Sequence, residues 1–400
     1  MRILSSVYRL MHACAAGQRK RLLRAAAALL AGFFLGMLAL SLKVIVTAYR
    51  DSGGIVLPNK QFVGGDFAAF YTAGKIVREN RFELYDFEVQ RRMQSELGAK
   101  SGAQNKFLPF CYPPLVALLV APLAEFSLLH AFYVWLILSV FLFLSGSVLA
   151  ARSLKIPLGA SLFFLLAAFS FQPLIMDSLA GGQASCLGFF IGALVLFFLK
   201  NKNDAAAGVC LALSYYKPPL FALYVVFLLL DRRWKMLAGF CGAGALLVWL
   251  SVLFAGLEGI RELIFRGARY TYAGGLPDDP TFMLREGAGL FALCEMLSFA
   301  PRSAQAVSCA AALLIIIFIR QKLLGGREDA GRLPVELVFA LQFSVSIFLS
   351  PHVLMHDLVL VLLPVLIAAV HLVRFETGAG GVCCVLSMFF LYFAFLFPEV

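Results

Sequence analysis

The sequence predicts an all-α protein, built as a polytopic bundle of transmembrane helices. Of its 400 residues, 61% are apolar and only 14% are charged, and the mean hydropathy is +0.87. A soluble domain carries about 25% charged residues, so this chain cannot supply the polar surface of a soluble globular enzyme. It is also too apolar to be disordered. The apolar residues occur in runs of helical length and not in alternating strands of about ten residues, which argues against an outer-membrane barrel.

The chain begins with a basic segment, residues 1–23, which we expect to stay in the cytoplasm because Lys and Arg before a first span are retained there. An apolar run from about 24 to 49 follows. It is too long for the core of a signal peptide and no small-residue cleavage site follows it, so we predict a first transmembrane helix. Residues 24–400 are predicted to form a single membrane domain without a separate soluble domain.

The longest polar stretch of the chain, about 51–110, comes next and is expected on the outer side. It contains two amphipathic segments, which we interpret as helices that lie on the outer membrane surface. Their apolar faces are formed by Phe67, Phe70 and Tyr71 in the first segment, and by Tyr85, Val89, Met93 and Leu97 in the second.

Further apolar runs bring the predicted number of spans to about eleven, within a range of 10 to 13. The segments 111–127 and 282–300 are short and interrupted by Pro, Gly or charge, so we expect re-entrant helices there. The basic groups between spans then fall in the cytoplasm, which explains the net charge of +11 without a nucleic-acid partner. The other predicted spans are about 128–151, 157–176, 181–200, 204–217, 219–231, 235–255, 303–320, 334–350, 353–374 and 378–397.

In this topology six polar motifs face the extracytoplasmic side, where we predict one composite site. Asp66, in GGDFAAFYTAGK, is either a helix N-cap or a general base with a raised pKa at the apolar boundary. Tyr71, in the same motif, is a candidate for substrate binding. Tyr112, in FCYPPLVALLVAPL, either lines the site or only precedes a re-entrant helix. Gln183, in GGQASCLGFF, either joins two helices or contacts a ligand.

The next motifs carry cations or histidines. Lys217, in LALSYYKPPLFALY, either snorkels to the interface or pairs with a phosphate, the role that we favour because a lysine at such depth is costly. His352 and His356 stand four residues apart and share a helix face. They could hold a metal together with Asp357, form a structural pair at the mouth of a span, or contact a phosphate or sugar, which we favour.

Three arginines fall outside, against the usual charge bias. They could bind an anionic headgroup or a lipid phosphate, or pair with acidic neighbours on the surface. The arginines are Arg261, Arg266 and Arg269, and the acidic neighbours are Glu258, Glu262, Asp278 and Asp279.

The sequence lacks a Walker A motif and a Gly-rich dinucleotide loop. Its nine cysteines include no CxxC pair and no Cys/His cluster. We therefore expect no zinc site, and we expect an activated substrate to arrive from the membrane or from outside.

The order of these blocks resembles the polyprenol-phosphate-dependent glycosyltransferases of family 87, which are membrane enzymes of the GT-C type formerly grouped under a domain of unknown function. The resemblance covers roughly 24–375. It is carried by GGDFAAFYTAGK, LYDFEV, YPPLVALLVAPLAEF, GGQAS, AGVCLALSYYKPPLFALYVVFLLLDRRWK and SPHVLMHDLVLVLLP.

The resemblance implies a GT-C fold that needs no cofactor and no metal, and it assigns roles to three positions. It implies that Asp66 is the catalytic base, that Lys217 is the family's lysine before the proline break, and that His352 or His356 is its late histidine. Two motifs depart from the family pattern and leave the sugar and the acceptor open. Ser185 stands where the family usually has Asn, and DDPTFMLREGAGL replaces an Asn/Ser pattern.

The resemblance further implies that a hexose, with mannose the leading case, moves from a polyprenyl-phosphate sugar to a glycan or glycolipid acceptor, with inversion. The enzyme would lie in the inner membrane with a cytoplasmic N-terminus and an extracytoplasmic site. Two alternatives remain. A transporter or flippase of an anionic lipid-linked substrate predicts an internal repeat, and none is visible. A non-catalytic subunit of envelope assembly predicts that Asp66→Asn is tolerated.

Overall fold

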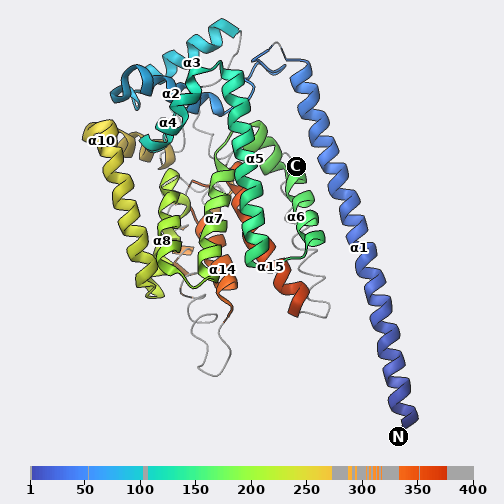
Figure 1. Ribbon diagram of the computed structural model, residues 1–400. Coiled ribbons are helices and arrows are strands. Elements are labelled where there is room, and N and C mark those ends of the chain that lie inside the picture. Colours follow the sequence, from blue (N-terminus) through green and yellow to red (C-terminus); the bar gives the residue numbers. More distant parts are fainter. Residues whose placement is uncertain are drawn as a thin grey trace.

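A computed structural model of the chain describes residues 2–52, 54–101, 107–272, 287–290, 333–350 and 352–375, with scattered positions between 293 and 317. Within these residues the regular structure is helical (Figure 1). Extended residues pair there only as two isolated bridges, Val56 with Phe62 and Gly287 with Leu354. The all-α prediction is confirmed for the part of the chain that the structure describes.

Four described helices are long and apolar enough to cross a membrane. They are Ala25–Arg50 of α1 (Arg2–Arg50), α5 (Leu128–Ser153), Trp234–Gly267 of α10 (Trp234–Tyr272), and Met355–Leu372 of η7 (Met355–Val361) and α15 (Leu362–Phe375). A fifth span results if α6 (Leu158–Ser170) and the π-helical turn η3 (Pro173–Ala180) count together, across a bend of 65°. This bend lies at Pro173, where a proline cannot continue the hydrogen-bond ladder of a helix.

The predicted total of about eleven spans is not reached by the described helices. Several predicted spans form shorter helices, and the predicted span 378–397 lies outside the described residues, while 303–320 is described only at scattered positions. The segment 111–127, predicted to be re-entrant, forms two short helices. The shorter helices are α4 (Pro114–Val120), η2 (Ala121–Glu125), α7 (Ser185–Lys200), α8 (Asp204–Ala212), η4 (Leu213–Tyr216), η5 (Pro218–Leu220), α9 (Ala222–Leu230) and α14 (Val335–Phe348).

Close packing of small residues holds the bundle together. A Cβ atom at Gly208 of α8 would lie 1.9 Å from the Met236 carbonyl oxygen of α10, and one at Gly239 would lie 2.3 Å from the Ala205 carbonyl oxygen. Only glycine lets two helix backbones approach this closely. By contrast, α1 stands at the outside of the bundle and packs mainly on α6 (Figure 1).

The polar stretch after α1 folds onto one end of the bundle, as α2 (Phe67–Asn80), η1 (Arg81–Glu83) and α3 (Phe87–Ser101) (Figure 1). The apolar faces that were predicted to lie on the membrane pack instead on protein. Phe67 and Phe70 are buried, and their rings lie 5.7 and 5.5 Å from the ring of Trp135 in α5. Tyr85, ahead of α3, is buried too. The periodicity identified the face of α2 correctly, whereas in α3 the predicted Val89, Met93 and Leu97 are only half buried and Gln90 and Gln94 are buried. It could not distinguish a protein partner from lipid.

Candidate functional site

Two glycine turns from distant parts of the sequence meet beneath α2. The Asp66 amide donates to the Gly181 carbonyl oxygen at 2.9 Å. Gly64 and Gly182 have φ values of 81° and 75°, in the left-handed region that favours glycine. A Cβ atom at Gly182 would lie 2.6 Å from the Phe67 Cβ. The absence of side chains therefore lets the two turns touch, and this contact brings Asp66 to Gln183.

Asp66, Gln183 and Tyr112 form a chain of hydrogen bonds. The Gln183 Nε2 donates to Asp66 Oδ2 at 2.5 Å, and the Tyr112 hydroxyl donates to Gln183 Oε1 at 3.1 Å. Tyr85 supports this chain, because its hydroxyl donates to the Tyr112 carbonyl oxygen at 2.8 Å. Three residues predicted from separate motifs thus lie together, and both the orientation and the amide flip of Gln183 follow from the hydrogen bonds.

The Asp66 carboxylate is directed to this chain and not to its own helix. Asp66 occupies the N-cap position of α2, but its side chain accepts no capping hydrogen bond in the described structure. Burial raises the pKa of Asp66 above the usual value of an aspartate, and the hydrogen bond from Gln183 and the charge of Lys217 offset part of this rise. A carboxylate with a raised pKa accepts a proton more readily than an ordinary aspartate.

Lys217 forms a buried ion pair in the break between η4 and η5. Its Nζ donates to both carboxylate oxygens of Asp357, at 2.7 and 2.6 Å, and lies 3.1 Å from the His356 Nε2. The Lys217 side chain is 8% exposed and that of Asp357 is fully buried. The ammonium group therefore points into the protein, and does not snorkel to an interface.

This pair also fixes the tautomer of His356. An ammonium group only donates hydrogen bonds, so Nε2 accepts, and the proton of a neutral His356 resides on Nδ1. Asp357 in turn accepts a bond from the Leu354 amide at 3.0 Å, which anchors the start of η7. Within the described residues no group of three or more His, Cys, Asp or Glu side chains is arranged for a metal ion.

His352 lies just ahead of η7 and is almost fully buried. Burial, together with the charge of Lys217, lowers its pKa to about 4. His352 is therefore neutral near pH 7 and acts there as a donor or acceptor of hydrogen bonds, not as a fixed positive charge.

Two of the three arginines predicted to bind an anion, Arg261 and Arg266, make contacts at the surface and not with Asp66 or Lys217. Arg261 pairs with Glu258 at 3.5 Å, and both side chains are mostly exposed. Arg266 pairs with Glu262 one turn away on α10, and its guanidinium lies over the ring of Phe87. Its charge also acts on the thiol of Cys111, next to Tyr112. The side chain of Arg269 lies outside the described residues.

Tyr71 is buried on the same helix as Asp66, but its hydroxyl is bound elsewhere. It donates to the Phe126 carbonyl oxygen at 2.7 Å, and the Lys75 ammonium lies over its ring. Tyr71 therefore joins α2 to the end of η2, away from the Gln183 chain.

Sequence reasoning missed two supports of the site. Asp357 was considered only as a metal ligand, although a lysine buried in an apolar run requires a buried counter-ion, and Asp357 lies in a late apolar run. Trp135 was not singled out; its Nε1 donates to the Gly182 carbonyl oxygen at 2.9 Å. No pattern in an apolar span distinguishes such a tryptophan from a lipid-facing one.

A comparison with protein-family models identifies the family. The model of glycosyltransferase family 87 matches residues 110–398, a range that contains Tyr112, Gln183, Lys217 and Asp357 and begins after Asp66. The searches of curated proteins and of solved structures found no match.

Proposed function

We propose that this chain, which belongs to glycosyltransferase family 87 and is a membrane glycosyltransferase, takes its sugar from a polyprenyl-phosphate donor. The acceptor is an extracytoplasmic glycan or glycolipid, and the sugar is a hexose, with mannose the first candidate from the family resemblance. The observation that carries this proposal is that η3, which leads into the turn that holds Asp66, packs against η7, whose Asp357 binds Lys217, so that the lysine charge acts on Asp66. A carboxylate beside a lysine, histidine and aspartate cluster buried in the apolar bundle suits a donor that arrives through the bilayer.

Asp66 acts as the general base. Its carboxylate takes the proton from an acceptor hydroxyl, whose oxygen attacks the anomeric carbon while the bond to the lipid phosphate breaks. A single displacement of this kind inverts the anomeric centre. The raised pKa of Asp66 supports this role, because it strengthens the base, while Gln183 fixes one carboxylate oxygen and leaves the other for the substrate.

The Lys217 cluster stabilises the leaving phosphate. Since Lys217 already donates to Asp357 and His356, its main task is to hold His356 with the Nδ1 proton available. A hydrogen bond from that proton and the nearby charge of Lys217 both stabilise the negative charge that develops on the phosphate oxygens as the bond to the sugar breaks. This division of labour differs from a direct contact between Lys217 and the phosphate, and it gives Asp357 a positioning role.

The proposal is tested with purified protein in lipid nanodiscs, incubated with polyprenyl-phosphate sugars in the absence of nucleotide. Release of polyprenyl phosphate from one hexose donor, dependent on an added glycan or on water, is the expected result. A flippase would instead move the intact donor between leaflets of a vesicle without breaking it. Movement without release, for every hexose donor offered, would contradict the proposal.

A further inference from the structure

Two buried hydroxyl groups have no hydrogen-bond partner among the residues that the structure describes. They are the Ser185 Oγ, at the start of α7, and the Tyr216 hydroxyl, at the end of η4. Ser185 is 2% exposed and Tyr216 is 5% exposed. A buried hydroxyl without a partner costs free energy, and alanine and phenylalanine at these positions would avoid that cost. The two hydroxyls therefore serve a purpose other than the folding of the chain.

The surroundings of Ser185 explain why its hydroxyl has no backbone partner. A serine in a helix often donates to the carbonyl oxygen three or four residues earlier. For Ser185 these residues are Gly182 and Gly181, whose carbonyl oxygens accept instead from the Trp135 Nε1 and the Asp66 amide, both at 2.9 Å. The contacts that position Asp66 thus leave the Ser185 hydroxyl available, close to the proposed base.

The Tyr216 hydroxyl rests against Gly188 of α7, one turn after Ser185. A Cβ atom at Gly188 would lie 2.3 Å from this hydroxyl, so only glycine leaves room for it. Tyr216 directly precedes Lys217, and the charge of Asp357 acts on the Tyr216 hydroxyl. The second hydroxyl therefore lies beside the Lys217 cluster.

The packing of α7 along η7 and α15 places both hydroxyls near one level of the bundle. A Cβ atom at Gly188 would lie 3.1 Å from Leu360, and one at Gly192 would lie 3.1 Å from Leu363. The two segments therefore run side by side in the same direction. Ser185, three residues ahead of Gly188, then lies at the level where η7 begins and where the buried ion pair is found.

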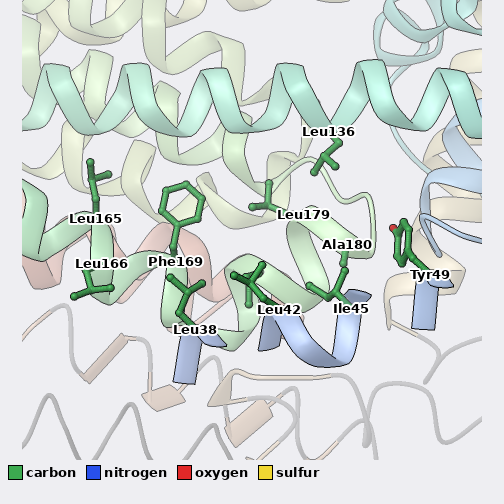
Figure 2. A pocket seen from close by; sticks show the side chains of 11 residues that line it. Leu38, Leu42, Ile45, Tyr49, Leu136, Leu165, Leu166, Phe169, Leu179 and Ala180 are labelled. Atoms are coloured by element: carbon green, nitrogen blue, oxygen red, sulfur yellow. The ribbon is translucent and has the colours of Figure 1, made fainter. Parts of the chain in front are cut away.

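The apolar pocket on the outside of the bundle does not suit a sugar. It lies between α1 and the layer formed by α5, α6 and η3 (Figure 2). Apart from the hydroxyl of Tyr49, the side chains that line this pocket are hydrocarbon. A hydroxyl-rich ligand would lose its hydrogen bonds to water there without gaining others.

We propose that Ser185 and Tyr216 bind hydroxyl groups of the transferred sugar and so determine which hexose the enzyme accepts. The inference rests on the proposed function, in which the anomeric carbon lies between Asp66 and a phosphate held by the Lys217 cluster. One of the two hydroxyls adjoins the base, and the other adjoins that cluster. Serine and tyrosine hydroxyls both donate and accept hydrogen bonds, as the hydroxyls of a sugar do.

Both hydroxyls are sealed from solvent in this structure, so a sugar reaches them only when α7 and η4 move apart. Each hydroxyl lies beside a break in the helical structure. Ser185 follows the Gly181–Gly182 turn, and Tyr216 stands two residues ahead of Pro218. The ends of helices are where a chain takes up such movements.

Thermal unfolding without a donor tests whether the two hydroxyls are available to a ligand. Ser185→Ala and Tyr216→Phe should unfold at the wild-type temperature or above it, because neither variant loses a hydrogen bond. Ser346→Ala is the control and should unfold at a lower temperature. The buried Ser346 hydroxyl accepts from the Tyr224 amide at 3.1 Å and donates to the Leu220 carbonyl oxygen at 2.8 Å. A loss like that of Ser346→Ala in Ser185→Ala or Tyr216→Phe would reveal a partner within the protein and overturn the assignment.

Kinetics with a panel of donors tests the contact with the sugar. The panel contains the hexose donor that wild type uses and its monodeoxy analogues, each of which lacks one sugar hydroxyl. Ser185→Ala should lower kcat/KM about tenfold for the parent donor and cause no further loss for the analogue that lacks the hydroxyl it binds. Tyr216→Phe should show the same pattern, whereas Ser346→Ala should affect all donors by one factor. Equal losses for every donor in Ser185→Ala and Tyr216→Phe would contradict the proposal.

A binding measurement separates a failure of this proposal from a failure of the proposed function. Polyprenyl-phosphate mannose and polyprenyl phosphate without a sugar should each raise the unfolding temperature of wild type. In Ser185→Ala and Tyr216→Phe only the rise caused by the mannose donor should be smaller. That result without any turnover would retain the sugar contact and reject the reaction. Equal rises in wild type and both variants would reject the contact, whether or not the reaction occurs.

Discussion

Single side chains set the chemistry of the site, and Gln183 shows how. Its amide donates to Asp66 and accepts from Tyr112, so it links the loop that carries Tyr112 to the loop that carries Asp66, the proposed base. The same bond lowers the pKa of Asp66, against the larger effect of burial. Gln183 is thus a positioning residue whose effect can be read in the pH dependence of turnover.

Replacing Gln183 by Met should move the acidic limb of the pH–rate profile to higher pH. The base works only when it is deprotonated, so its activity falls as the pH drops through the pKa of Asp66. Without the stabilising bond to the carboxylate, that pKa rises further. Gln172→Met, at a half-buried glutamine before Pro173, is the control and should leave the limb in place. An unchanged limb in Gln183→Met would show that the base is another group.

Single residues also show what sequence can predict about the site. Asp66 and Gln183 were predicted to converge because the charged loops place both motifs on the same side of the membrane, and they do lie in contact. The partner of Lys217 was not predicted. Its depth requires a buried counter-ion, but Asp177, Asp231 and Asp357 all lie in or beside apolar runs, and hydropathy does not select one of them. The hydroxyl of Tyr71 is likewise bound by a backbone carbonyl 55 positions away, which periodicity does not reveal.

Among the elements, the broken helices at Lys217 and at η7 depend on each other. Pro218 and Pro219 interrupt the helix after η4, and the 3-10 helix η7 precedes α15. The Lys217–Asp357 ion pair joins the two breaks.

Lys217→Met should destabilise the protein by about 3–5 kcal/mol, because it leaves a buried carboxylate without its cation. The double variant Lys217→Met/Asp357→Leu should recover part of that loss, as measured by thermal unfolding in detergent.

The exposed pair Arg78–Glu125 provides the control for this measurement. Glu125→Gln should change the free energy of unfolding by less than about 1 kcal/mol, since exposed pairs contribute little. A double variant no more stable than Lys217→Met would mean that the two segments are held by other contacts.

The contact of the two glycine turns should be equally sensitive. Gly182→Ala forces a left-handed backbone on an L residue, at about 1–2 kcal/mol, and drives a Cβ atom against Phe67. We expect it to lower thermal stability and to abolish most turnover. Gly159→Ala in α6 is the matched control, because no atom lies within 4 Å of the added Cβ. Wild-type turnover in Gly182→Ala would show that the turns need not touch.

The two ends of the helix bundle differ in what they carry. One end carries α2, α3 and the candidate site, and the other carries the pairs Lys200–Glu336 and Asp204–Arg233. Composition and the length of the apolar runs predicted the all-α class, because a backbone in the bilayer core must satisfy its own hydrogen bonds and does so in helices. They overestimated the length of single helices, since glycine turns and prolines cut apolar runs: α7 begins only at Ser185, after the Gly181–Gly182 turn.

The predicted orientation can be checked with cysteines at opposite ends of the bundle. Asn59 precedes α2, and Asn201 ends α7; both are exposed. In intact cells and a cysteine-free background, a membrane-impermeant maleimide should label Asn59→Cys and leave Asn201→Cys unlabelled until the cells are opened. The reverse pattern would place Asp66 in the cytoplasm, contrary to the charge bias of the loops.

The most direct measurement compares wild type with Asp66→Asn in nanodiscs, on the hexose donor that wild type uses. Asp51→Asn, an exposed aspartate of the same polar stretch, is the matched control. Loss of a general base should lower the release of polyprenyl phosphate by at least about a hundredfold, with unchanged thermal unfolding and with full activity in Asp51→Asn. Turnover near the wild-type rate in a folded Asp66→Asn protein would contradict the assignment of Asp66 as the base.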